Sequence, residues 1–364
     1  MKKIFFIVLL ISTAIYAENL KVNKDEIKKL IGQMIIVGFP NESVNSKSKI
    51  IRDINKYNLA GVILFDKFYK NRTKVKNIRS PKQLQLLTQN LQNLSMKNII
   101  ISIDQEGGKV QRLKSTQGFH STPSAKKISQ KPLAVVKSHY KTMASMLSKN
   151  GINCNFAPLV DLSINQDNFI IEGLERSYGN SSTEVIRNAE IFIDTLKKQN
   201  IISVLKHFPG HGSSKNDSHK GFVDISNTWS QKELEPYKYF IKHNKADMIM
   251  TAHVFNNHLD AQYPATLSYK INTQLLRNQL GFKGVIISDD LQMKAISKHY
   301  TLEQTVTLAI NSGIDILLFG NQLDYYNTDE LIEVIFKNVQ NGSIKLERIQ
   351  EANQRISLLL NQNQ

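Results

Sequence analysis

Residues 98–112 read Asn-Ile-Ile-Ile-Ser-Ile-Asp-Gln-Glu-Gly-Gly-Lys-Val-Gln-Arg, an apolar run that passes directly into charged residues and glycines. The run is rich in isoleucine and has no polar alternation, which is typical of a strand buried on both faces of a parallel sheet. Seven further runs share this character. The eight predicted strands are 33–39, 60–65, 98–103, 152–160, 202–205, 248–250, 284–287 and 314–319.

Longer stretches with helical spacing separate these runs. The clearest of them follows Pro81, which suits a first helical turn, and its leucines recur close to a 3.6-residue repeat at Leu84, Leu86, Leu87, Leu91 and Leu94. The predicted helices are 81–96, 133–149, 182–198, 231–242, 271–280, 302–311, 329–339 and 346–360. Alternation of eight buried strands with helices predicts an α/β fold, a single (β/α)8 TIM barrel over residues 18–364.

Five of the predicted strands run, at their carboxyl ends, into polar residues that a packed core would not select. These are Asp104, Asp161, Lys206 with His207, His253 and Asp289. In a parallel barrel the carboxyl ends of the strands converge on one mouth, where active sites are built. Helix capping explains a single aspartate in such a place but not five polar ends, so we expect a site at this mouth.

Two of these ends suggest specific roles from their neighbours. Gly107 and Gly108 permit a tight turn that lets Asp104 and Arg112 face one pocket, where they suit hydrogen bonding to vicinal sugar hydroxyls. Asp289 is the first residue beyond its strand and is expected to enter the mouth. Its neighbour Asp290 is expected to cap the following helix.

The loop after the fifth strand contains an acid two residues before a histidine, Asp217-Ser218-His219. Such an acid can hold one ring nitrogen and leave the other to exchange a proton near neutrality. A metal site is the alternative use of this region. No histidine pair has helical spacing with a glutamate, and one cysteine does not make a thiolate site, so we expect neither metal nor cofactor. The candidate ligands are His207, His211, Asp217, His219 and His253.

The amino terminus and the composition bear on location and partners. Residues 1–17 combine Lys2 and Lys3 with an apolar run and a small residue, Ala17, which predicts a cleaved signal peptide, export to the periplasm and no stable membrane insertion. The formal charge is +16, or +14 without Lys2 and Lys3, but the basic residues are scattered and no nucleic-acid-binding motif accompanies them. The single cysteine, Cys154, is predicted to be a core residue.

These segments, in this order, resemble glycoside hydrolase family 3, specifically the β-N-acetylhexosaminidases of NagZ type. The resemblance runs from Ile35 to about Ile356 and rests on five motifs. They are Asp-Gln-Glu-Gly-Gly-Lys-Val-Gln-Arg at 104–112, Asn-Phe-Ala-Pro-Leu-Val-Asp at 155–161, Lys-His-Phe-Pro-Gly-His-Gly at 206–212, Asp-Ser-His at 217–219 and Ser-Asp-Asp-Leu-Gln-Met at 288–293. The loop at 165–173 fits the family pattern poorly, which leaves the leaving-group preference open.

The resemblance implies a retaining exo-β-N-acetylglucosaminidase that acts on peptidoglycan-derived fragments through a covalent glycosyl-enzyme. It implies that Asp289 is the nucleophile and that His219, supported by Asp217, is the acid/base. It also implies that the sugar is bound by residues matching the family's substrate contacts, which are Asp104, Arg112, Arg176, Lys206 and His207. We expect a carbohydrate substrate, no nucleic-acid partner and a monomer.

Three alternatives remain open at this point. Because a histidine repels phosphate less than a carboxylate does, the enzyme could transfer the sugar to phosphate in place of water. Its specificity could also be broader and include chitin oligosaccharides. A non-catalytic barrel that binds the cell wall is the alternative from outside the enzymes.

Overall fold

The computed structural model describes residues 23–215, 217–218 and 221–362. The predicted signal peptide at 1–17 and the predicted acid/base His219 lie outside these residues. Within the described part of the chain, no helix combines the length and the apolarity needed to cross a membrane.

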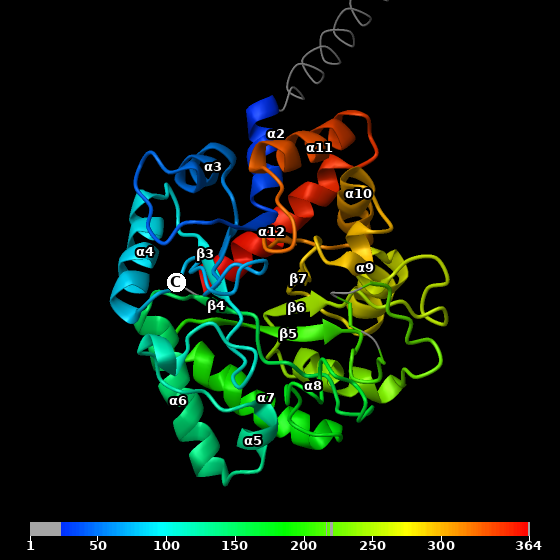
Figure 1. The fold of residues 1–364 in the computed structure, drawn as a ribbon. Helices are drawn as coiled ribbons and strands as arrows, with labels where there is room; N and C mark the ends of the chain where they lie inside the picture. The colour runs from blue at the N-terminus through cyan, green and yellow to red at the C-terminus, as the bar shows by residue number, and fades with distance from the viewer. Residues whose placement is uncertain (1–22, 216, 219–220, 363–364) are drawn as a thin grey trace, which may run out of the picture.

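The fold is a barrel of eight parallel strands surrounded by helices (Figure 1), as predicted. Neighbouring strands pair in the order β7-β6-β5-β4-β3-β2-β1-β8, and a parallel bridge from Ile287 to Ile316 joins the two ends of that order. The strands are β1 (Ile35–Gly38), β2 (Gly61–Ile63), β3 (Ile100–Ile103), β4 (Cys154–Asn155), β5 (Ile202–Phe208), β6 (Met248–Thr251), β7 (Val285–Ser288) and β8 (Leu317–Phe319). Every strand residue is buried, which is why these runs lack polar alternation.

The helices pack outside the barrel and follow the predicted positions closely. The predicted ones are α4 (Pro81–Leu94), α6 (Leu133–Lys149), α7 (Ser182–Lys197), α8 (Glu235–Lys242) after the 3₁₀ turn η2 (Gln231–Leu234), the π-helix η4 (Lys270–Gln279), α10 (Leu302–Ser312), α11 (Thr328–Gln340) and α12 (Leu346–Gln362). Side-chain caps set several starts: Ser80 accepts from the Gln83 amide at α4, and Thr301 and Gln304 form a capping box at α10.

Four α-helices of the described residues were not predicted: α2 (Lys24–Gly32), α3 (Lys49–Tyr57), α5 (Ala125–Ser129) and α9 (Lys294–Ser297). Helix α3 was readable, because Ile50, Ile54 and Tyr57 recur at helical spacing and are buried. Helices α5 and α9 are too short to carry a periodic signal. The expectation for Cys154 is confirmed, since its thiol is fully buried in β4.

Candidate functional site

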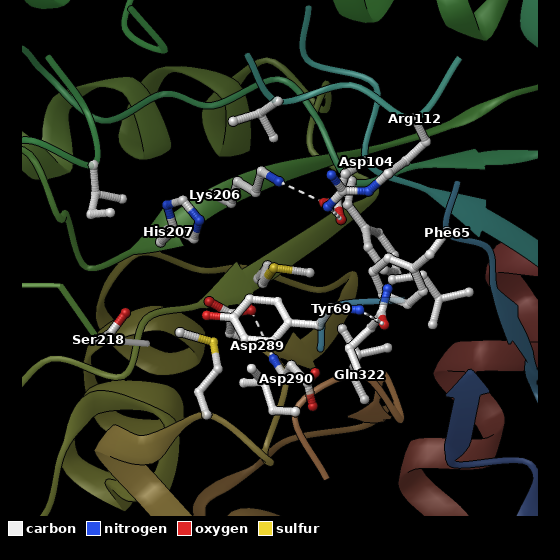
Figure 2. Close-up of a pocket in the computed structure, with 18 of the residues that line it drawn as sticks. Phe65, Tyr69, Asp104, Arg112, Lys206, His207, Ser218, Asp289, Asp290 and Gln322 are labelled. Carbon is white, nitrogen blue, oxygen red and sulfur yellow. Dashed lines mark hydrogen bonds and ion pairs between the residues drawn. The ribbon is translucent and has the colours of Figure 1, made fainter. Parts of the chain in front are cut away.

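A cavity of about 260 Å³ opens at the carboxyl ends of the barrel strands. Residues from the ends of β2, β3, β5, β7 and β8 line it, and it contains most of the residues predicted for the site: Asp104, Arg112, Arg176, Lys206, His207 and Asp289. Figure 2 shows Asp104, Arg112, Lys206 and His207 along one wall, with Asp289 and Asp290 across the cavity from them. The barrel therefore brings together side chains that are up to 185 positions apart, from Asp104 to Asp289.

Asp104 is held between two cations. Its Oδ2 accepts a hydrogen bond from Arg112 Nη2 at 2.9 Å, and its Oδ1 lies 3.1 Å from Lys206 Nζ. Burial opposes ionisation of Asp104, but Lys206 and Arg112 outweigh it, so the pKa of this carboxyl is lowered. The predicted turn is confirmed: Gly107 and Gly108 have φ of 109° and 56°, and a Cβ on Gly107 would lie 2.1 Å from the Pro123 carbonyl oxygen.

Glu106 forms the buried end of the same network. Arg176 donates from Nε and Nη2 to its two oxygens at 2.8 and 2.7 Å, and Lys206 Nζ lies 2.7 Å from Oε1. Burial opposes ionisation here too, but Arg176 and Lys206 lower the pKa of Glu106. This bidentate pair orients Arg176 toward the cavity. Lys206 therefore lines the cavity while its ammonium group is paired with both Asp104 and Glu106.

Lys206 and His207 are consecutive residues, yet both line the cavity. In a regular strand their side chains would point to opposite faces. The register between β5 and β6 shifts between Leu205 and Phe208, and such irregularities re-aim side chains beside active sites. Asp161 then orients the imidazole, because its Oδ2 lies 2.7 Å from His207 Nδ1 and it also accepts the His207 backbone amide.

Asp289 enters the mouth as predicted, at the end of β7. Its Oδ1 accepts the backbone amide of Asp290 at 2.7 Å, which holds the carboxylate in one orientation. The prediction for Asp290 is wrong. This residue also lines the cavity, and its Oδ1 accepts from the backbone amides of Gln292 and Gly320, whereas the next helix, α9, begins four residues later without a side-chain cap.

The loop after β5 carries the predicted acid/base pair, and the structure describes only part of it. Ser218 lines the cavity, and Asp217 is half-buried beside it in the chain. Asn168 braces this loop, donating from Nδ2 to the carbonyl oxygens of His211 and Gly212 at 2.9 and 3.2 Å. The loop at 165–173, which departs from the family pattern, thus supports the loop that precedes His219.

Sequence reasoning did not assign to substrate binding several polar residues that line the cavity, among them Lys67, Tyr69, Arg72 and Gln322. Two further polar residues of the cavity region that it did not assign to binding are His211 and Glu106. Burial lowers the pKa of His211 to about 4, so its ring is neutral at physiological pH. Its Nδ1 lies 2.8 Å from Ser214 Oγ, and within the described residues its Nε2 is buried without a hydrogen-bond partner. His211 itself lines the cavity. Both residues stood inside quoted motifs, but nothing local distinguished them from structural positions.

Glu233 secures the β5 loop from behind, since its Oε2 accepts the Gly212 amide at 2.8 Å. Burial raises the pKa of Glu233 to about 7, so the folded protein retains a proton that the unfolded chain releases near the ordinary pKa of a glutamate. The free energy of unfolding should therefore fall as pH rises from about 4.5 to 7, by roughly 2–3 kcal/mol from this group. We expect Glu233→Gln to remove that part of the slope and to stabilise the protein at pH 8, as measured by urea unfolding across this range.

Glu235→Gln is the matched control, because it makes the same substitution at a neighbouring glutamate whose side chain is exposed. Its unfolding curve should keep the pH dependence of the parent protein. Parallel pH profiles for the parent and Glu233→Gln would show that Glu233 is ionised in the folded state.

Within residues 23–215, 217–218 and 221–362, no three His, Cys, Asp or Glu side chains are grouped so that they could hold a metal ion. The cavity instead contains fixed donors and acceptors in alternation, with an oriented carboxylate opposite them. This arrangement suits a small polyhydroxylated ligand, whose vicinal hydroxyls both donate and accept. A carboxylate held across from such a ligand can act as a nucleophile or stabilise positive charge on it.

Comparison with known proteins gives a consistent picture. Residues 26–359 match the family described as glycosyl hydrolase family 3 N terminal domain. The chain is 30% identical over 337 residues to "Beta-hexosaminidase A" of Pseudoalteromonas piscicida, which covers 84% of this chain and 54% of that protein. It is 34% identical over 277 residues to "Beta-hexosaminidase" of Haemophilus ducreyi, covering 72% of this chain and 75% of the relative.

A solved structure shares the fold along almost the whole chain. The glycoside hydrolase family 3 beta-N-acetylglucosaminidase from Paenibacillus sp. str. FPU-7 superimposes with a TM-score of 0.83 at 29% identity, covering 92% of this chain and 62% of that one. The chain thus spans about half the length of the Pseudoalteromonas relative and somewhat under two thirds of the Paenibacillus protein.

Proposed function

Because this chain belongs to glycoside hydrolase family 3, we propose that it is an exo-acting β-N-acetylhexosaminidase that removes terminal β-linked N-acetylglucosamine from peptidoglycan-derived fragments. The names of its relatives support the activity. The observation that carries the proposal is the cavity itself, where Asp289 lies across from the hydrogen-bonding cluster of Asp104, Arg112 and Lys206. A small cavity with such a wall suits one sugar ring at the end of a chain.

The proposed reaction is a retaining, two-step displacement. The carboxylate of Asp289 attacks the anomeric carbon and the bond to the leaving oxygen breaks, which forms a glycosyl-enzyme. A second group protonates the leaving oxygen and then removes a proton from water as water attacks the intermediate. We assign this proton transfer to His219 with Asp217 as its partner, on the strength of the motif that they form. Hydrogen bonds that the sugar hydroxyls donate to Asp104 can strengthen as positive charge develops on the ring, because the hydroxyls become more acidic.

We further propose that the protein is exported and acts in the periplasm after cleavage of residues 1–17, as a monomer. The basic, then apolar, then small-residue pattern of that segment supports export. Muropeptides and glycan-chain ends are the substrates that this location would supply. The proposal involves no cofactor and no nucleic acid.

The activity is tested with a pair of chromogenic substrates. We expect nitrophenol release from nitrophenyl N-acetyl-β-glucosaminide at least about 100-fold faster than from nitrophenyl β-glucoside, because a site that hydrogen-bonds an acetamido group leaves polar atoms unpaired without it. NMR of the first product should show the β-anomer. Folded protein that releases nitrophenol from neither substrate would refute the proposal. If sugar 1-phosphate forms when phosphate is added, the reaction is phosphorolysis and not hydrolysis.

His219→Ala tests the proton transfer. The first step should slow about 1,000-fold for a disaccharide, whose leaving sugar must be protonated, but only about 10-fold for the nitrophenyl glycoside, whose leaving group departs without a proton. Single-turnover release of each leaving group measures this step. His258→Ala, which changes an exposed histidine, is the control and should leave both rates unchanged. Equal losses on the two substrates would rule out His219 as the acid.

A further inference from the structure

The excess positive charge of the chain is concentrated in one part of the barrel, although the individual lysines are dispersed along the sequence. Of the 47 lysines and arginines, 17 lie in residues 67–160, but only two of the 31 acids do, Asp104 and Glu106. The remaining 30 cations and 29 acids nearly balance. Almost all of the formal charge of +16 therefore comes from the segment that runs from the end of β2 to just after β4.

This charge is left unneutralised on the outer helices of the segment. Its two acids are used at the base of the cavity, where they pair with Arg112, Arg176 and Lys206. Helices α4 and α6 contain no acid. Within the described residues, no carboxylate forms an ion pair with the exposed lysines of α6, which are Lys137, Lys141 and Lys149.

A groove of about 500 Å³ lies between α4 and α6, on the outside of the barrel at the left of Figure 1. A second hollow of about 300 Å³ continues it toward the carboxyl end of α6, because Gln85 and Lys149 line both. Gln85 Nε2 donates to Asn150 Oδ1 at 3.5 Å, and a Cβ on Gly151 would lie 2.4 Å from Thr88 Oγ1. Helix packing therefore forms the groove before any ligand arrives.

The groove is lined by cations and by side chains that form hydrogen bonds. Lys141 and Lys149 supply the charge, and no acid of the described residues lines either hollow. The hydroxyl and amide groups of the lining include those of Ser138, Thr142, Ser145, Gln85 and Gln89. Hydroxyls and amides both donate and accept, as the hydroxyls of a sugar do, whereas ammonium groups pair with acids. The lining thus matches a ligand that is both polyhydroxylated and acidic.

Two other classes of polyanion match the groove less well. Sites for single-stranded nucleic acid combine basic residues with aromatic platforms on which bases stack, but no Arg, Tyr or Trp of the described residues lines either hollow. Membrane surfaces attract helices that present basic residues together with apolar ones. The exposed apolar residues of α6, Leu133 and Val135, lie outside the groove, and a flat bilayer does not fill a hollow between two helices.

We propose that the groove between α4 and α6 binds an acidic polysaccharide. The carboxylates of the polymer pair with Lys141 and Lys149, and its hydroxyls form hydrogen bonds with the uncharged side chains of the lining. The two lysines are about 12 Å apart along α6 at 1.5 Å per residue, which suits acids that recur along a chain and not a single small anion. The groove and the cavity at the mouth share no lining residue, so this site retains the protein on a polymer independently of the proposed reaction.

Fluorescence anisotropy with a labelled oligogalacturonate tests the site in the full chain. We expect the acid form to bind at least about 10-fold more tightly than its methyl ester at low salt, and this difference to disappear at about 1 M salt. The double variant Lys141→Gln with Lys149→Gln should bind the acid form at least about 10-fold more weakly, because both pairing cations are lost. Its thermal midpoint should equal that of the parent protein, since both lysines are exposed.

Lys238→Gln with Lys242→Gln is the matched control, because it removes two exposed lysines from a different helix, α8, with the same change in net charge. This variant should keep the full affinity. Equal affinity for the oligogalacturonate and its ester, or equal losses in the two double variants, would overturn the site. Tighter binding of oligothymidylate or of phosphatidylglycerol vesicles, if the α6 double variant abolished it, would also overturn the proposal and assign the groove to nucleic acid or to a membrane.

Discussion

Replacing Asp289 with alanine should lower kcat for nitrophenyl N-acetyl-β-glucosaminide by at least about 10⁴-fold and leave the fold intact. The residue stands at the end of β7 with its carboxylate oriented by the Asp290 amide, across the cavity from Asp104 and Lys206 (Figure 2). Without it the glycosyl-enzyme cannot form, and the remaining groups can only bind the sugar. Steady-state kinetics gives the loss, and the thermal midpoint should shift by only a few degrees. A slow fluorinated N-acetylglucosaminide should label one peptide of the parent protein, the one that contains Asp289.

The neighbouring carboxylate offers a demanding control. Asp290 also lines the cavity, but its Oδ1 accepts two backbone amides, those of Gln292 and Gly320. Asp290→Asn should therefore reduce stability by about 1–2 kcal/mol and affect kcat much less than Asp289→Asn. A larger loss of turnover for Asp290→Asn, or a fluorosugar label on another peptide, would exclude Asp289 as the nucleophile.

Replacing Asp315 with asparagine should lower the free energy of unfolding by about 3–5 kcal/mol. This carboxylate is fully buried just before β8 and contacts three guanidinium groups. Its Oδ1 accepts from Arg348 at 2.6 Å and from Arg355 at 3.1 Å, both on α12, and its Oδ2 contacts Arg277 on η4. Without the negative charge of Asp315, the neighbouring guanidinium groups at the amino end of the barrel would have little negative charge to neutralise them. Urea unfolding followed by circular dichroism measures the effect.

Asp329 gives the comparison, since it also contacts several partners but lies at the surface. It pairs with Lys49 and Lys56 and accepts from the Tyr57 hydroxyl, with 43% of its side chain exposed. Asp329→Asn should cost no more than about 1 kcal/mol, because solvent screens such pairs. Comparable losses of unfolding free energy for the two variants would mean that burial does not increase the contribution of the Asp315 ion pairs to stability. Folded Asp315→Asn should retain its kcat, because the cluster lies at the end of the barrel away from the cavity.

Much of the barrel was predictable because its signals are local. A run such as 98–103 is apolar throughout, since a strand inside a closed parallel barrel is buried on both faces. Polar residues at the ends of those runs then implied one mouth. Such local signals are weak for short elements. They are also weak for a side chain whose role is to accept hydrogen bonds from backbone amides. Helices α5 and α9 were missed for the first reason, and Asp290 was misassigned for the second.

The sequence by itself determined the order of the strands and of the longer helices, several of the residues that gather at the mouth and the family to which the chain belongs, because each is encoded in neighbouring residues. Those mouth residues include Asp104, Lys206, His207 and Asp289. Only the tertiary structure decided which charges neutralise one another. Glu106 forms ion pairs with Arg176 and Lys206, while Lys67 and Arg72 have no carboxylate partner among the described residues. Pairing of charges depends on distances of a few ångströms between segments far apart in the chain, and those distances exist only once the barrel has closed.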